Sequence, residues 1–231
     1  MTRHFERQIE KLNIMLMRVG TRVEQAVESA VTALETSDGE LARKIIEEDE
    51  IIDQLEVDVE EECLHALALY QPVASDLRFI LSLVKINNEL ERIGDLAVGL
   101  AEETLFLIQE APDNRGLDEL IEAGRIACQM VRQSIESVVQ RDVDLAEQVC
   151  TSDDRIDSIH RAMYHKVKSE LRAHPENAAR EVDLLCVSRQ IERIADHAVN
   201  IAEDVLYTVS GEICRHRNKA SRAELASDHE P

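Results

Sequence analysis

The chain has 231 residues, enough for one large domain or two small ones. Its 47 acidic and 26 basic residues give a formal net charge of −21, so its surface repels nucleic-acid backbones and anionic membranes. With 3% aromatic residues, 7 glycines and 4 prolines, the composition argues against a β-rich fold and against glycine-rich nucleotide-binding loops.

We expect a cytoplasmic protein. The opening residues, MTRHFERQIEK, are charged and lack the apolar core of a secretory signal. The longest run without Asp, Glu, Lys or Arg, residues 63–75, is too short to span a bilayer and contains Pro72. The 5 cysteines form no C-x-x-C pair, which favours a reducing compartment over a disulfide framework or a zinc site.

Long stretches of helical periodicity, separated by prolines and short polar turns, predict an all-α fold. We expect six long helices, at residues 4–36, 39–70, 74–109, 116–141, 143–173 and 178–209. Pro72, Pro112 and Pro175 each stop a helical pattern, because proline lacks a backbone N–H. The short loops predict two tandem antiparallel three-helix bundles, at residues 1–110 and 111–209, and a polar tail at 210–231 in which Gly211 ends the last helix.

Three helices carry apolar seams that we expect to face the core. The third and sixth follow heptad spacing. The third-helix seam is Phe79, Leu83, Ile86, Leu90, Ile93, Ala97 and Leu100. The sixth-helix seam is Leu184, Val187, Ile191, Ile194, Ala198, Ile201 and Val205. On the second helix the shared face is Leu41, Ile45, Ile52, Leu55, Val59, Ala66 and Leu69.

The two halves of the chain repeat each other. The segment Glu91-Arg92-Ile93-Gly94-Asp95 returns as Glu192-Arg193-Ile194-Ala195-Asp196, 101 residues later. Upstream the offset is 104, which matches Asp38, Asp49 and Asp53 with Asp142, Asp153 and Asp157. A difference of three residues is an ordinary change in loop length, so we interpret the chain as a duplicated three-helix unit.

Each half carries two carboxylate pairs at spacing i, i+4, which puts both members of a pair on one helix face. The pairs are Asp49/Asp53, Glu91/Asp95, Asp153/Asp157 and Glu192/Asp196. Two pairs on neighbouring helices would offer carboxylate oxygens to a cation such as Mg²⁺, Mn²⁺ or iron. Because Glu91 and Asp95 point away from the seam of their helix, a metal there would lie at the surface.

Other interpretations of these residues stay open. An acidic i, i+4 pair in a chain with 32% charged residues is commonly a solvated face. Arg92 and Arg193 are local counter-charges or partner contacts, and His197 is either a nitrogen ligand or a polar flanking residue.

An enzyme with a di-iron carboxylate site is a further alternative, because such sites use Glu-x-x-His motifs. Glu62-Cys63-Leu64-His65 is one such motif, but the repeat places Ser169 where a second histidine is needed. Asp157-Ser158-Ile159-His160 is similar but lies in a different register. Since no other catalytic arrangement is visible, we expect a protein that is not an enzyme.

In these motifs the chain resembles the PhoU family of bacterial regulators of phosphate uptake, over roughly residues 4–209. The resemblance rests on the duplicated Glu-Arg-Ile-x-Asp, on the pairs Asp49/Asp53 and Asp153/Asp157, and on Ala74-Ser75-Asp76-Leu77-Arg78 after Tyr70-Gln71-Pro72. It implies two three-helix bundles, surface clusters of iron, zinc, manganese or magnesium at the acidic pairs, and frequent homodimers. The second half departs from the pattern, with Ala195 in place of Gly94 and no second Asp-Leu-Arg.

The resemblance also implies a function. PhoU-like proteins act with the phosphate ABC transporter, through its ATPase, and with the phosphate-sensing histidine kinase, and they restrain uptake and signalling when phosphate is plentiful. On this basis we expect a cytoplasmic adaptor that reaches the membrane only through its partners, with Asp76, Arg78, Arg92 and Arg193 as contacts. Close relatives instead serve a low-affinity phosphate transporter, and a coiled-coil scaffold is the structural alternative.

Overall fold

The computed structural model describes residues 3–110 and 116–210, and this part of the chain consists of long helices without a strand. The helices are α1 (Arg3–Thr36), α2 (Gly39–Tyr70), α3 (Ser75–Glu110), α4 (Asp118–Gln140), α5 (Val143–Ala173) and α6 (Ala178–Ser210). A single 3₁₀ turn, η1 (Pro175–Asn177), precedes α6 where the sequence predicted a loop. The predicted all-α fold is therefore confirmed, and the helix bounds agree with the expected ones to within two residues.

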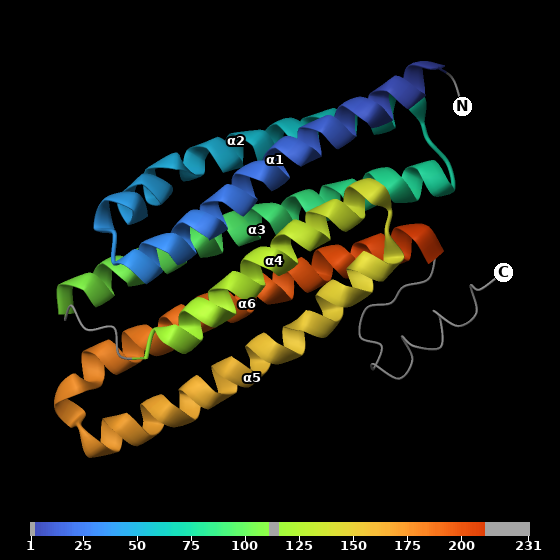
Figure 1. Cartoon of the computed structure of the whole chain (residues 1–231). Helices are drawn as coiled ribbons and strands as arrows, with labels where there is room; N and C mark the ends of the chain where they lie inside the picture. Colours follow the sequence, from blue (N-terminus) through green and yellow to red (C-terminus); the bar gives the residue numbers. More distant parts are fainter. Residues whose placement is uncertain (1–2, 111–115, 211–231) are drawn as a thin grey trace.

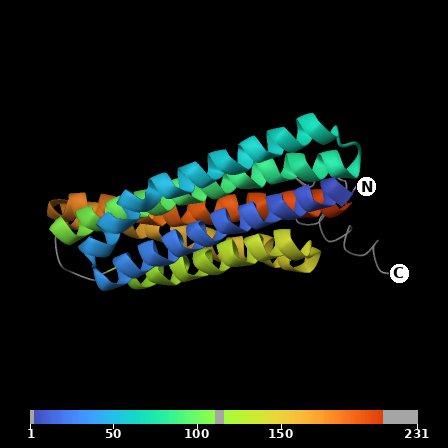
Figure 2. The same ribbon diagram turned by 90° about the horizontal axis from the view of Figure 1, so that it is seen from above.

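The helices form two antiparallel three-helix bundles, α1–α3 and α4–α6, that lie side by side (Figure 1). The bundles meet where α3 packs along α6 and α1 packs along α4. Seen from above, all the helices run nearly parallel to one long axis, so the molecule is elongated (Figure 2). The predicted boundary near residues 110–111 borders the segment 111–115, which lies outside the described residues, as do Pro112 and the tail 211–231 with Gly211 and Cys214.

The apolar seams of α3 and α6 are buried along their whole length, as the heptad spacing predicted. They belong to one continuous core that the two bundles share. Burial of this kind contributes roughly 1.5–3 kcal/mol for each large apolar side chain. On α2 one prediction is wrong: Leu69 is 72% exposed, although Leu67 and Tyr70 at the same end of the helix pack against the core.

The two halves use the same local signals to begin α2 and α5. The Asp38 carboxylate accepts hydrogen bonds from the backbone N–H groups of Glu40 and Leu41, at 2.9 and 3.0 Å. The Asp142 carboxylate accepts one from the Leu145 N–H at 3.0 Å. Such N-caps typically contribute about 1 kcal/mol each. Asp38 and Asp142, which the repeat matches with each other, are therefore the N-capping residues of α2 and α5.

The bundles are joined by reciprocal close contacts between α1 and α4. Gly20 lies against Ile135, and Gly124 lies against Val31. Because Gly124 follows Gly20 by 104 residues and Ile135 follows Val31 by the same number, the two contacts are equivalent under the repeat. The offset found for α2 and α5 thus also holds for α1 and α4.

The turn between α2 and α3 presents apolar side chains to solvent. Val73 in the turn is 74% exposed, and Leu69 in the last turn of α2 is 72% exposed. Gln71 and Ala74 both have left-handed backbones, with φ of 44° and 52°. A left-handed non-glycine residue costs roughly 1–2 kcal/mol, so the turn is held in this form by its surroundings.

Candidate metal centres

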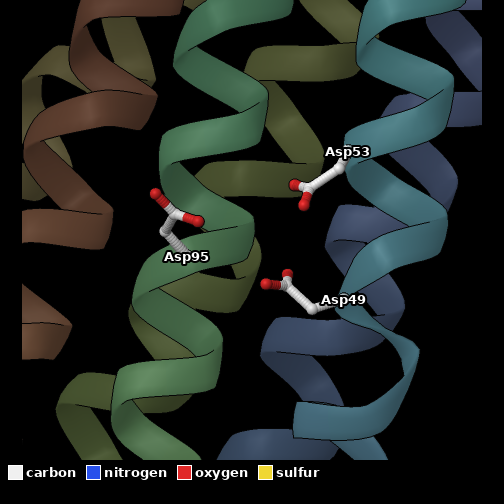
Figure 3. A group of neighbouring side chains, drawn as sticks. All are labelled: Asp49, Asp53 and Asp95. Carbon is white, nitrogen blue, oxygen red and sulfur yellow. The ribbon is translucent and has the colours of Figure 1, made fainter.

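In the first half, three of the predicted carboxylates meet in the groove between α2 and α3. Asp49 and Asp53 extend from α2 toward Asp95 on α3 (Figure 3). One carboxylate oxygen from each lies within 4.8 Å of the others. The helical spacing of four residues places both α2 carboxylates on the face that α3 covers. The predicted meeting of pairs from neighbouring helices therefore occurs here.

Glu91, the fourth predicted member, lies one turn before Asp95 but is more enclosed than expected. Its side chain is 23% exposed, against 45% for Asp95. Burial raises the pKa of Glu91, and the charge of Asp95 adds to the rise. The expectation that both residues point to open surface thus holds for Asp95 only. The face opposite the α3 seam is partly covered by α2, which a single-helix projection does not show.

Like charges in the groove repel one another, and this repulsion adds to the effect of burial on the pKa of Asp49 and of Glu91. Burial raises the pKa of Asp49, and the nearby charges of Asp53 and Asp95 add to the rise. Arg92 offsets part of the repulsion, because its guanidinium lies 3.5 Å from Glu91 and 3.4 Å from Asp95. Of the two roles considered for Arg92, the structure shows a local counter-charge.

The second half carries its two pairs on the neighbouring helices α5 and α6, where burial and nearby acids raise the pKa of Asp153 and of Asp196. Burial raises the pKa of Asp153 to about 6, followed by the charges of Asp157, Asp196 and other nearby acids, among them Glu192. Burial also raises the pKa of Asp196, whereas His197 and the exposed Arg193 lower it. Asp153 is therefore within electrostatic reach of the other three predicted members of this half, but no three of these four residues bring carboxylate oxygens within 4.8 Å of one another, as Asp49, Asp53 and Asp95 do.

The donor sets fit a hard or borderline metal ion. Asp153 Oδ1 is enclosed and accepts no hydrogen bond from any described residue, whereas the enclosed Glu91 Oε2 accepts no hydrogen bond but has the Arg92 guanidinium 3.5 Å away. A buried carboxylate oxygen without a donor is costly, and a bound cation would satisfy it. Carboxylates at the separation of Asp49, Asp53 and Asp95 can serve as ligands for Mg²⁺, Mn²⁺ or iron.

The two clusters differ at a neighbouring position that sequence reasoning did not connect to them. Glu56 in the first half accepts a hydrogen bond from Asn87 at its backbone oxygen, at 2.9 Å. The repeat replaces this pair with His160 and Ser188, which are hydrogen-bonded at 2.9 Å. The sequence repeat could have revealed this difference, because Glu56 matches His160 at the offset of 104 and Asn87 matches Ser188 at the offset of 101. The repeat position that carries a carboxylate in the first half therefore carries an imidazole in the second.

His197 was considered as a nitrogen ligand of the second cluster. Its Nδ1 instead lies 2.6 Å from Glu89 Oε2, on α3 of the other bundle. Asn200 donates a hydrogen bond to the same Glu89 oxygen at 3.0 Å. His197 therefore links the two bundles, a contact that depends on how α3 and α6 are aligned and has no signature in the sequence.

The Glu-x-x-His motif does not assemble a second metal site among the described residues. Glu62 is held by Gln8 and Lys11 of α1, at 2.6 and 2.5 Å, and His65 is exposed. His160, from the similar motif, lies in the other bundle.

The remaining predicted contact residues lie at the start of α3. Asp76 is half-buried in its first turn, and Arg78 is exposed.

None of the helices in the described part of the chain combines the length and the apolar character that a membrane span requires.

Comparison with known proteins identifies the family. The PhoU domain model matches twice, at residues 16–104 and 120–205, one match in each bundle. The "Phosphate-specific transport system accessory protein PhoU homolog" of Pseudomonas putida is 37% identical over 93% of this chain and 84% of its own length. The corresponding protein of Escherichia coli K12 is 31% identical over 92% of this chain and 88% of its own.

Solved structures agree with this assignment. The crystal structure of PhoU from Pseudomonas aeruginosa superposes with a TM-score of 0.87 at 36% identity, covering 90% of this chain and all of that one. The phosphate transport system regulatory protein PhoU from Streptococcus pneumoniae gives a TM-score of 0.84 at 27% identity, covering 90% of this chain and 98% of that one. By its two matched domains, its relatives and its fold, the chain belongs to the PhoU family.

Proposed function

We propose that this protein regulates phosphate uptake and phosphate-starvation signalling as a cytoplasmic adaptor. It would contact the ATPase of a phosphate ABC transporter and a phosphate-sensing histidine kinase, and it would reach the membrane only through them. The proposal is supported by family membership and by the names of the relatives, which are accessory proteins of phosphate-specific transport. The duplicated acidic groove is the observation that carries it, because it gives each half one equivalent charged site.

Metal binding at the two grooves is part of this proposal. Asp49, Asp53, Glu91 and Asp95 would hold one site, and Asp153, Asp157, Glu192 and Asp196 the other, with Mg²⁺, Mn²⁺, zinc or iron as the ion. A bound cation would relieve the repulsion among these carboxylates. The carboxylates would then present a partly neutralised surface to a partner, and a homodimer would present four such grooves.

Arg92 and Arg193 flank the grooves at equivalent positions, 101 residues apart. Both are exposed, and both lower the pKa of acids in the groove beside them. Their guanidinium groups are therefore placed to contact a partner that docks over a groove. We assign them a second role, as partner contacts, in addition to the local pairing of Arg92.

The turn between α2 and α3 is the second contact surface that we assign. It combines the exposed Leu69 and Val73 with Arg78 and the partly buried Asp76. Exposed apolar side chains beside charged ones are typical of protein–protein contacts. The strained left-handed residues of the turn are consistent with a surface kept for binding rather than for stability.

Affinity purification tests the adaptor role. Tagged protein is recovered from phosphate-rich and phosphate-starved cells, and captured proteins are identified by mass spectrometry. We expect the transporter ATPase or the sensor kinase, with more captured in phosphate-rich cells. If neither protein is captured in either condition, the adaptor role is contradicted. Capture of a low-affinity phosphate transporter would instead favour a role as an accessory protein of that transporter.

Two variants separate the surfaces in this experiment. In D49N/D53N/D95N the first groove loses its charge, and in L69S/V73S the turn loses its apolar side chains. The matched control is E6Q/E61Q/D144N, which removes three exposed charges elsewhere. We expect reduced capture with either test variant and unchanged capture with the control.

A further inference from the structure

A cleft of about 290 Å³ opens between α1 and α2 in the first half. Its floor is apolar and is formed by Ala26, Leu41, Ile45, Ile52 and Val98. Polar side chains of both charge signs line the rest. The volume is close to the lower end of the range for small-molecule sites, roughly 300–1,000 Å³. The cleft shares Asp49 with the acidic groove but is otherwise made of different residues.

Arg22 brings a free guanidinium to this cleft. It is exposed and makes no ion pair within residues 3–110 and 116–210. Several other arginines of the two bundles are paired, as Arg125 with Glu35 at 2.5 Å and Arg155 with Glu122 at 2.7 Å. In a chain of net charge −21, an arginine without a carboxylate is available to an external anion.

A second cation lies on the same cleft. Lys44 is 3.7 Å from Glu48, a long and exposed i, i+4 pair. Such exposed pairs contribute little to stability, so the Lys44 ammonium can turn to a bound anion at small cost. Glu48 and Asp49, in turn, offer carboxylates that accept hydrogen bonds from hydroxyl groups.

The repeat shows that this chemistry belongs to the first half only. At the positions 104 residues later, Arg22 becomes Ile126 and Lys44 becomes Gln148. Ala26, which leaves room on the floor, becomes the fully buried Met130. Both cations and the open floor are thus absent together from the second half, so the cleft is not a general consequence of the fold.

We infer that the cleft binds a small phosphorylated polyol, a phosphate monoester on a hydroxylated carbon skeleton. Arg22 and Lys44 hold the phosphate, Glu48 and Asp49 accept hydrogen bonds from hydroxyl groups, and the carbon skeleton covers the apolar floor. A bare phosphate ion fits less well, because it has no carbon skeleton to cover the apolar floor and no sugar hydroxyl groups to donate to the two carboxylates. Sugar phosphates and nucleoside monophosphates share the required chemistry.

Isothermal titration calorimetry tests this inference on the full chain in buffer with a chelator. The probes are ribose 5-phosphate, AMP, inorganic phosphate and ribose. We expect ribose 5-phosphate or AMP to bind at least tenfold more tightly than inorganic phosphate or ribose. Whichever of the two binds more tightly identifies the skeleton that the cleft accepts.

Three variants locate the binding. Arg22→Gln removes the guanidinium, and Ala26→Met fills the floor with the residue of the second half. Arg18→Gln, one turn away on α1 and also without an ion pair in the described chain, is the matched control. We expect at least tenfold weaker binding with Arg22→Gln and Ala26→Met, and a change below twofold with Arg18→Gln.

Any of three results would overturn the inference: inorganic phosphate binds as tightly as the esters, neither ester binds, or Arg22→Gln leaves the binding unchanged. Thermal melting confirms that Ala26→Met folds, and Arg22→Gln tests the site without changing its packing. The inference goes beyond the proposed function, and because metal and partner proteins are absent from the titration, its failure leaves that function untouched.

Discussion

Gly124 of α4 packs so closely on Val31 of α1 that a Cβ atom at position 124 would lie 2.9 Å from Val31 Cγ2. The equivalent contact under the repeat brings position 20 to 3.0 Å from Ile135 Cγ2. Two glycines thus allow α1 and α4 to approach closely, and this contact joins the two bundles together with the more extensive packing of α3 along α6.

Gly124→Ala should lower the free energy of unfolding by about 1 kcal/mol. Alanine favours a helix by about 1 kcal/mol over glycine, but overpacking against the stiff, β-branched Val31 costs roughly 1–3 kcal/mol. Gly99→Ala is the control: its Cβ would lie 2.7 Å from the Nε2 at the flexible end of Gln190. Urea denaturation should show a loss for the first and no loss for the second; equal effects would contradict this account.

His197 and Glu89 should contribute to the docking of the bundles. Their 2.6 Å contact joins α6 to α3, with both side chains about four-fifths buried. A double-mutant cycle with His197→Ala and Glu89→Gln, measured by urea denaturation at neutral pH, should give a coupling energy of about 1 kcal/mol. The cycle of His174 and Glu176, an exposed pair at 3.3 Å, should give a value near zero. A coupling for His197 no larger than this control would contradict the docking role.

Asp153 should make stability depend on pH. Because burial and neighbouring acids raise its pKa to about 6, the folded chain retains a proton that the unfolded chain has released. The contribution of this bound proton to the free energy of unfolding is complete below about pH 4 and is lost as the pH rises through 6. In metal-free buffer at pH 7.5, Asp153→Asn should raise the free energy of unfolding by about 1 kcal/mol, reduced from the full shift because the group is partly solvated.

The same variant should have little effect at pH 4, where Asp153 carries its proton in the folded state. Glu61→Gln, on the exposed surface of α2, should change stability little at either pH. Chemical denaturation at the two pH values checks both statements. An equal effect of Asp153→Asn at pH 4 and pH 7.5 would show that its titration is not the cause.

Metal ions should stabilise the protein through two separate grooves. At about a hundredfold excess over the dissociation constant, each saturated site should contribute about 2.7 kcal/mol, a rise in Tm of about 5–10 °C. D49N/D53N/D95N should keep only the contribution of the second groove, and D153N/D157N/D196N only that of the first. Thermal melting with Mn²⁺ and after chelation measures this, with elemental analysis for stoichiometry. An unchanged Tm in all three proteins would exclude a metal role.

The local features of this fold were open to sequence reasoning because they depend on residues three or four positions apart. The seams from Phe79 to Leu100 and from Leu184 to Val205 predicted two buried helix faces, and both are buried. Spacing of four also placed Asp49 and Asp53 on one face, opposite the partner pair. Duplication then extended each observation to the other half.

The sequence by itself determined six helices, their duplication and the pairing of the acids, since helical period and capping act within one turn. Only the tertiary structure decided which helices align side by side and at what depth. That alignment enclosed Glu91, brought His197 to Glu89 and left Leu69 exposed. The reason is physical: packing between helices depends on how side chains of distant segments interdigitate, and no periodicity within one segment encodes the alignment of two.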